Sequence, residues 1–109
     1  MFKIDVDNVV EVQVKFTLKS GKVNKSFGAT LTARRLTKEE QDALPSDLLM
    51  KDFLLDNVTD WKDQRLVLDE TGQPAPFSRE AFDAFLSVPG VLDVTVEAYR
   101  RETRGKEKN

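Results

Sequence analysis

Apolar and polar residues alternate strictly between Val10 and Leu18. The even positions of this stretch are apolar and the odd positions are polar. A period of two describes a β-strand with one buried face and one solvated face. The β-branched and aromatic residues found here suit a half-buried pleated surface. The pattern therefore predicts a strand over residues 10–18.

A second strand is predicted at Val23–Leu31, after a short turn. We expect an antiparallel hairpin in which Leu18 faces Val23. A connection of two or four residues keeps the apolar side chains on one face, whereas a connection of three residues exposes them. In this register Lys25 lies opposite Phe16, and its long side chain reaches out to solvent.

The hairpin needs a cover, because an isolated two-stranded ribbon is marginally stable in water. Helix signals follow it along the chain. Thr37 and Glu40 have the spacing of a capping box, and the helix that they begin ends before Pro45. Ser46 or Asp47 is the expected N-cap of a second helix. Its leucines and phenylalanine make it the best candidate to cover the sheet.

A third helix is predicted after Phe77, with Ser78 as its N-cap and Phe77 packed on Phe82 as a hydrophobic staple. Pro89-Gly90 ends it. The last segment, Val91–Arg104, fits both strand alternation and a helical face. We favour a helix, because a proline stands near its start and a long charged run follows.

Three further segments complete the prediction. Phe2–Val6 alternates like a short third strand, with an extended lead-in as the alternative. Trp61 is expected to anchor the core through its ring and N–H, with a place in a protein interface as the alternative. Asp69–Gln73 is typical of a turn. The sequence thus predicts one α+β domain over residues 1–104, in which an N-terminal antiparallel hairpin is covered by three to four helices, and a disordered tail at 105–109.

The composition excludes several kinds of chemistry. The chain has no cysteine and no histidine, which removes disulfides, thiol chemistry and the commonest general base and metal ligand. Closely spaced carboxylates such as Asp56, Asp60 and Asp63 are expected to keep a helix surface solvated. We predict no catalytic, metal-ligating or cofactor-binding residue, and so no enzyme. No apolar run approaches the length of a membrane span, and no signal peptide is recognisable, so we expect a cytoplasmic protein without a membrane partner.

Charge is spread unevenly along the chain. Net charges are +4 over residues 1–36, −6 over 37–73, −3 over 74–99 and +3 over 100–109. One interpretation is a solvated surface with attraction between an acidic helical layer and a basic sheet. The other is a charged surface used for association. The basic ends hold few aromatic residues, which argues against a nucleic-acid partner.

The order of these motifs resembles that of a known family. The chain runs from a hairpin to Arg35-Leu36-Thr37-x-Glu39-Glu40, then to Val58-x-x-Trp61, and then to Asp69-Glu70-x-Gly72-x-Pro74-x-Pro76-Phe77-Ser78. It ends with Val-Pro-Gly-Val at 88–91 and Tyr99 ahead of a basic tail. This order is similar to that of the small tail assembly chaperones of long-tailed bacteriophages and prophages. The more β-branched stretch at 91–96 departs from the family pattern.

The resemblance implies a non-enzymatic assembly factor in the bacterial host cytoplasm. Members of this family coat the tape measure protein before the major tail tube protein polymerises around it, and they are absent from the finished tail. Some are also made in a longer, frameshifted form. The resemblance therefore implies the tape measure protein and the tail tube protein as partners, and a homo-oligomer would let many copies line one client.

The family supplies no binding residues that map onto this sequence. Our hypothesis is that Arg100, Arg101 and Arg104 lie at a protein contact, because they form a basic end on an acidic C-terminal half. Two alternatives stay open for the function. One is another small virion or head–tail joining protein, and the other is a host-directed adaptor or inhibitor.

Overall fold

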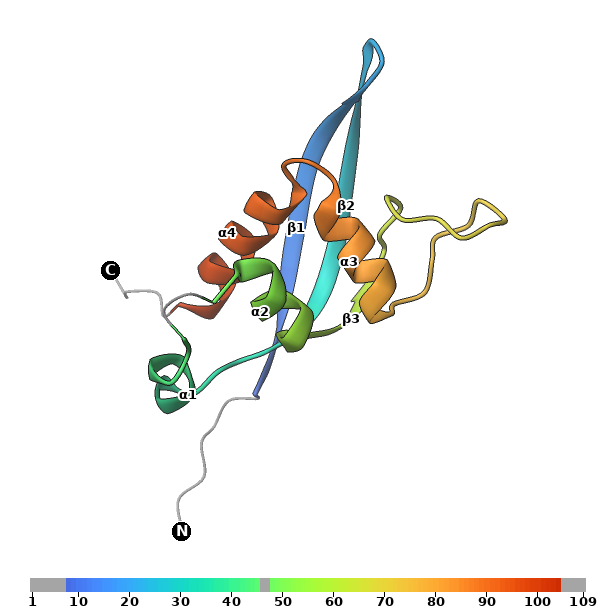
Figure 1. Ribbon diagram of the computed structural model, residues 1–109. Coiled ribbons are helices and arrows are strands. Elements are labelled where there is room, and N and C mark those ends of the chain that lie inside the picture. The colour runs from blue at the N-terminus through green and yellow to red at the C-terminus, as the bar shows by residue number, and fades with distance from the viewer. Residues whose placement is uncertain (1–7, 46–47, 105–109) are drawn as a thin grey trace.

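The computed structural model describes residues 8–45 and 48–104 of the 109-residue chain. Three antiparallel strands form one sheet in the order β1-β2-β3. Figure 1 shows α2, α3 and α4 on one face of this sheet, with α1 at its lower end. The predicted α+β class, with a hairpin covered by helices, is confirmed. The elements are β1 (Val9–Ser20), β2 (Val23–Arg34), α1 (Lys38–Asp42), α2 (Met50–Asn57), β3 (Val58–Lys62), α3 (Arg79–Ser87) and α4 (Val91–Thr103).

The predicted hairpin register is wrong by two residues. Ser20, not Leu18, pairs with Val23, and the connection is the two-residue turn Gly21-Lys22. Gly21 has a φ of +64°, the left-handed conformation that two-residue hairpin turns with glycine in first position require. Because a shift of two residues preserves parity, the predicted apolar face is kept. Lys25 consequently lies opposite Leu18 rather than Phe16.

The third strand of the sheet comes from a segment that the alternation did not identify. Val58–Lys62 follows α2 directly and pairs with the end of β2, with Leu31 opposite Trp61 and a register shift between Thr32 and Ala33. Five residues around a shift hold too few alternating positions for a period of two to be recognised. The third strand predicted at Phe2–Val6 lies outside the described residues.

The second helix was expected to cover the sheet, and the structure assigns this role to another helix. It is α4 that lies along β1, while α2 contacts β3, α3 and α4. The predicted caps of α2 at Ser46 or Asp47 fall on residues that the structure does not describe. Its N-cap is Leu49, which makes no side-chain cap and is 66% exposed.

The other helix boundaries agree with the sequence. Thr37 and Glu40 form both bonds of the capping box. Ser78 accepts a hydrogen bond from the Ala81 amide, and the Phe77 and Phe82 rings lie 5.8 Å apart as the predicted staple. The last segment is a helix, and Gly90 at φ +87° precedes it. Local signals at helix ends were therefore sufficient for these elements.

One hydrophobic core fills the space between the sheet and the helices. Its centre is aromatic, because Trp61, Phe82 and Phe85 contact one another with ring centroids 5.6–6.2 Å apart. Phe82 and Phe85 are fully buried. The core is completed by the inward residues of the hairpin, namely Val12, Val14, Ala29, Leu31 and Ala33. In the described part of the chain, no helix is long and apolar enough to cross a bilayer.

Candidate protein-binding surfaces

The outer half of the hairpin, residues 15–28, extends beyond the helical layer and is called the arm here. Figure 1 shows it rising above α3 and α4. The molecule measures 54 × 33 × 29 Å along its principal axes. The helices cover the inner face of the sheet from the root of the hairpin as far as Phe16, which touches Phe85 of α3. Beyond Phe16 the arm presents its inner face without a helix over it.

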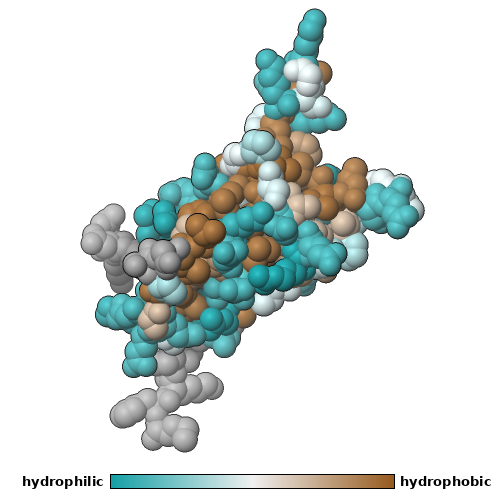
Figure 2. Space-filling view, viewed as in Figure 1, coloured by the Kyte–Doolittle hydropathy of each residue, from teal (hydrophilic) through white to brown (hydrophobic). Residues whose placement is uncertain are grey.

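The inner face of the arm carries the continuation of the core pattern. Phe16 stacks on Phe27 across the strands, with ring centroids 5.8 Å apart, and meets Phe85 of α3 edge to face at 5.9 Å. Leu18 is half-buried, and Val23 is 60% exposed. Figure 2 shows the apolar surface running from the body onto the lower part of the arm, with hydrophilic residues toward its tip. The apolar face thus becomes steadily more exposed outward from α3.

The arm is also strongly basic. It holds Lys15, Lys19, Lys22 and Lys25, and no acidic residue occurs between Glu11 and Glu39. The rest of the described chain holds ten basic and fifteen acidic side chains. Lys25 shares the inner face with the apolar residues, since it lies opposite Leu18. A positive arm on a negative body makes a dipolar molecule that attracts acidic partners to one end.

The three arginines predicted at a protein contact do not form one patch. Arg101 lies toward β1, where its guanidinium donates to the Gln13 carbonyl oxygen at 3.3 Å and pairs with Glu102 at 3.6 Å. Arg100 borders a hollow next to Met50 of α2, on the other side of α4. Arg104 is the C-cap of α4. Successive helical residues point about 100° apart, which is why neighbours in sequence separate here.

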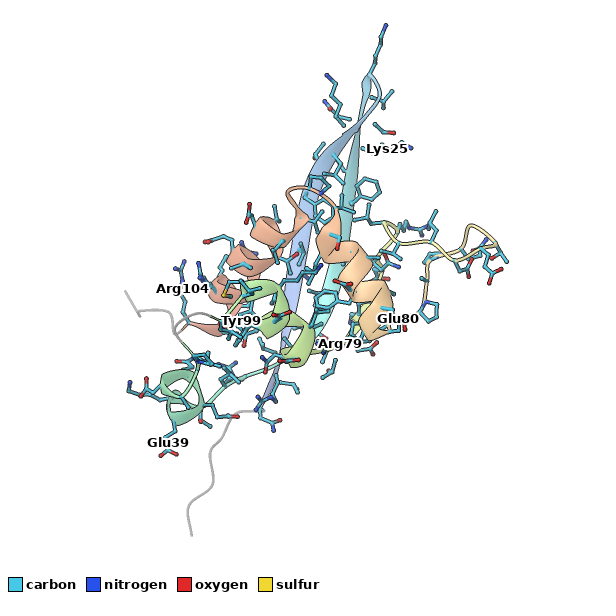
Figure 3. The ribbon with its side chains drawn as sticks, in the orientation of Figure 1. Lys25, Glu39, Arg79, Glu80, Tyr99 and Arg104 are labelled. Carbon is cyan, nitrogen blue, oxygen red and sulfur yellow. The ribbon has the colours of Figure 1, made fainter. Side chains whose placement is uncertain are left out.

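Figure 3 places Arg104 at the end of α4 and Lys25 on the arm, in separate parts of the molecule. The arm lysines are therefore a second group of basic residues, separate from the arginines of α4. Net charges summed over blocks of the sequence indicate only the arginines, because residues 1–36 combine the arm lysines with the rest of the sheet. The signal that could have found the arm was the run of 27 residues from 12 to 38 without a single carboxylate.

The groove between β1 and α4 has mixed charge. Lys15 and Arg101 line it together with Asp93, Glu97 and Glu102. Opposite charges at this spacing neutralise one another, so the groove offers no strong field to a charged ligand. Glu97 and Arg101, which are four apart on α4, make no salt bridge among the described residues, because Arg101 pairs with Glu102. The arm, in contrast, carries charge of one sign only.

Tyr99 holds α4 against the end of β2. Its hydroxyl donates to the Arg34 carbonyl oxygen at 3.0 Å, and its ring meets Phe53 edge to face at 5.3 Å. Burial raises the pKa of the Tyr99 phenol, against the smaller opposing effect of the Arg34 and Arg35 charges. The phenol therefore remains protonated at neutral pH and acts as a hydrogen-bond donor, not as a base.

Trp61 fulfils its predicted role as a core anchor. It is 8% exposed, and its indole N–H donates to the Ala75 carbonyl oxygen at 3.1 Å. Gln64, which the sequence analysis overlooked, organises the loop beside it. Its amide donates to the carbonyl oxygens of Val67 and Ala75 and accepts from two backbone amides, so this buried side chain is fully satisfied. Trp61 is consequently not available to a partner.

Within residues 8–45 and 48–104, no three acidic side chains are grouped closely enough to hold a metal ion. Asp69 has its pKa lowered by hydrogen bonds from the Thr71 hydroxyl and from the Gln73 and Thr71 amides, which close the predicted turn. The carboxylate thus serves the local backbone.

Comparison with known proteins found no match: no family model, no curated protein and no solved structure is similar to this chain at a significant level.

Proposed function

We propose that this chain is a non-enzymatic assembly chaperone that binds a helical client, and that the client is the tape measure protein of a long-tailed phage or prophage. The observation that carries the proposal is the uncovered inner face of the arm, where an apolar surface leaves the core and continues into solvent. Contiguous exposed apolar surface on a small protein is typical of a binding site. A holdase needs such a surface on a charged, soluble body.

The order of motifs supports the same proposal. The capping box at Thr37, the segment from Trp61 to Ser78 and the Val-Pro-Gly-Val step at 88–91 are the features that resemble tail assembly chaperones. Each lies at a helix end or in the loop that supports Trp61. These residues have structural roles, as expected of a family whose motifs are not catalytic. The proposed location is the bacterial host cytoplasm, with the major tail tube protein as a second partner and self-association along the client.

The experiment is co-expression of the tagged chain with the tape measure protein whose gene lies nearest to its own. We expect the tape measure protein to stay soluble and to co-purify with the chain, and the chain to be absent from finished tails. A tape measure protein that stays insoluble and unbound would overturn the proposal. Recovery of the chain from purified virions would instead identify a structural component, and binding to a single host protein would identify an adaptor.

The arginine hypothesis has its own variant. Replacing Arg100, Arg101 and Arg104 by Glu is expected to abolish co-purification with the tape measure protein, because it reverses the charge of the exposed end of α4. The fold should survive, since Arg100 and Arg104 lie on the surface and Arg101 makes only exposed contacts. Unchanged co-purification would remove these residues from the contact but leave the proposed function intact.

A further inference from the structure

The inner face of the arm lacks the helix that covers the same face nearer the root. At the root, α3 lies over the hairpin and Phe85 touches Phe16. One step further out, Leu18 and Val23 carry the apolar row on, and Val23 is 60% exposed. An amphipathic helix is the element that this chain itself uses to cover the face, so a helix placed next to α3 would extend the existing layer.

The charge of the arm determines the polar side of such a helix. Four lysines and no carboxylate lie between residues 12 and 28. Lys25 shares the inner face and Lys22 is in the turn, whereas Lys15 and Lys19 alternate with the apolar residues of the edge strand β1 and lie on its opposite face. A helix that sets glutamate or aspartate beside its apolar stripe would pair with Lys25 and Lys22, and a basic helix would be repelled by the positive arm.

Three other occupants fit the arm less well. A second arm carries the same four positive charges, so contact between two arms is electrostatically unfavourable. A strand added to the edge of β1 would meet Lys15 and Lys19, and lysines on an edge strand oppose such pairing. The body of the chain, with fifteen acidic and ten basic side chains outside the arm, would repel nucleic acid.

We propose that the arm binds an acidic amphipathic helix of a client protein, with Phe16, Leu18 and Val23 against its apolar stripe and with Lys22 and Lys25 against its carboxylates. This inference rests on the proposed function, since it names the kind of client segment that the chaperone recognises. The bound helix would lie next to α3 and would complete the helical layer over the outer half of the hairpin.

The probe is a labelled synthetic helix of about 20 residues, which spans about 30 Å, with leucines on one stripe and glutamates beside it among alanines. The matched probe has lysine in place of every glutamate. Fluorescence anisotropy with the full chain is expected to detect binding of the glutamate peptide only. Binding should weaken in about 1 M NaCl, where the Debye length falls to about 3 Å. Equal binding of both peptides would overturn the charge argument.

Two triple variants with the same change in net charge locate the site. K19E/K22E/K25E reverses the arm, and K38E/K62E/R79E reverses three exposed cations of the body that lie outside the arm and outside the end of α4. We expect the first variant to bind the glutamate peptide with a Kd about tenfold or more higher. The second variant should bind it with an unchanged Kd. The opposite result, or no effect of the arm variant, would overturn the inference. Circular dichroism and urea unfolding check that both variants fold.

A second pair of variants tests the apolar contact. Val23→Ser removes an exposed valine from the inner face of the arm, and Val9→Ser removes a 46% exposed valine from the other end of the same hairpin. Only Val23→Ser is expected to weaken binding of the glutamate peptide, by several-fold. Equal effects of the two substitutions would show that the apolar row of the arm does not form the site.

Sedimentation of the chain alone tests whether a second copy occupies the arm, and a binding assay with duplex DNA tests whether nucleic acid does. An oligomer that K19E/K22E/K25E converts to monomer would assign the arm to a second copy and overturn the inference. Binding of DNA without binding of the glutamate peptide would overturn it as well.

If the peptide binds but the tape measure protein does not co-purify, the arm site stands and the identity of the client is wrong. If the tape measure protein binds without the arm, the function stands and the inference fails.

Discussion

The ring of Phe16 on β1 meets the ring of Phe85 on α3 edge to face, with centroids 5.9 Å apart and planes at 75°. This contact is the boundary between the covered and the uncovered parts of the hairpin. Phe85 is fully buried on one side of it, and Phe16 is half-buried on the other. The contact joins the arm to the core, so a change at either ring affects both stability and the arm surface.

Phe85→Ala is expected to lower the free energy of unfolding by about 3–5 kcal/mol. The substitution removes the ring that also contacts Trp61 and Phe82 and leaves a cavity in the core. Urea unfolding followed by Trp61 fluorescence measures the effect. Phe27→Ala is the comparison, because Phe27 lies directly opposite Phe16 on β2, stacks on its ring and is only half-buried. A loss as large as that of Phe85→Ala would contradict the position of Phe27 on the uncovered arm.

Tyr99→Phe is expected to cost about 0.5–1.5 kcal/mol of unfolding free energy, because it removes one hydrogen bond to the Arg34 carbonyl oxygen and keeps the ring against Phe53. Urea unfolding at neutral pH gives this value. A variant as stable as the parent would mean that the hydroxyl bond does not help to hold α4 to β2.

The same residue makes a prediction for alkaline pH. Burial raises the pKa of Tyr99 in the folded state above its ordinary value of about 10. A raised pKa means that the folded chain retains a proton that the unfolded chain releases. This contribution to stability is therefore complete below about pH 10 and is lost as the pH rises toward the folded-state value. Tyr99→Phe should show a smaller alkaline loss of stability than the parent, and equal losses would assign the effect to other groups.

Glu40 is predicted to titrate below the ordinary glutamate value of about 4.3. Its pKa is lowered first by the Thr37 amide, which donates to Oε1 at 3.0 Å, and then by Arg34, whose guanidinium lies 2.6 Å from Oε2. A lowered pKa stabilises the capping box above that value, and the stabilisation is lost as the pH falls through the folded-state pKa. Carboxyl NMR of Glu40 measures the midpoint directly.

Arg34→Ala supplies the control for this titration. It removes the guanidinium but leaves the Thr37 bonds of the capping box, so the Glu40 midpoint should rise partway toward its ordinary value. A Glu40 midpoint that does not move in Arg34→Ala would contradict the ion pair.

Gly21→Ala is expected to destabilise the tip of the arm by about 1–2 kcal/mol, because a residue with a Cβ must adopt a φ of +64° there. The residues next to the turn are exposed, so amide hydrogen exchange in Lys19–Lys25 should speed up with little change in global unfolding. Gly72→Ala imposes the same strain in the 69–73 turn, at φ +83°. It should leave exchange in the arm unchanged, and a similar acceleration would indicate that the arm is not an independent local unit.

Local patterns predicted much of this fold. Period-two alternation identified both long strands and the face that they bury, and the capping residues Thr37 and Ser78 located helix starts. These signals need only neighbouring residues, because a cap or a pleat is satisfied within one turn or one strand pair. The register was wrong by two residues, since parity restricts a hairpin to even shifts without choosing among them.

The binding surfaces show where such patterns are insufficient. Arg100 and Arg101 are adjacent in sequence and were both predicted to lie at a protein contact, and the helix directs one toward α2 and the other toward β1. The arm lysines were visible as residues, but nothing local showed that the helices stop short of them. That depends on where α3 and α4 pack, which is a property of the whole core.

The sequence by itself determined the class of the fold, the inward face of the hairpin, the caps of α1 and α3, and the absence of histidine and cysteine. It did so because each of these features depends on residue type and short-range spacing. Only the tertiary structure decided that β3 completes the sheet, that α4 rather than α2 covers β1, and that the outer half of the hairpin stays uncovered. Those outcomes depend on how the large apolar side chains of distant segments fill one common volume, and a one-dimensional pattern does not specify that packing.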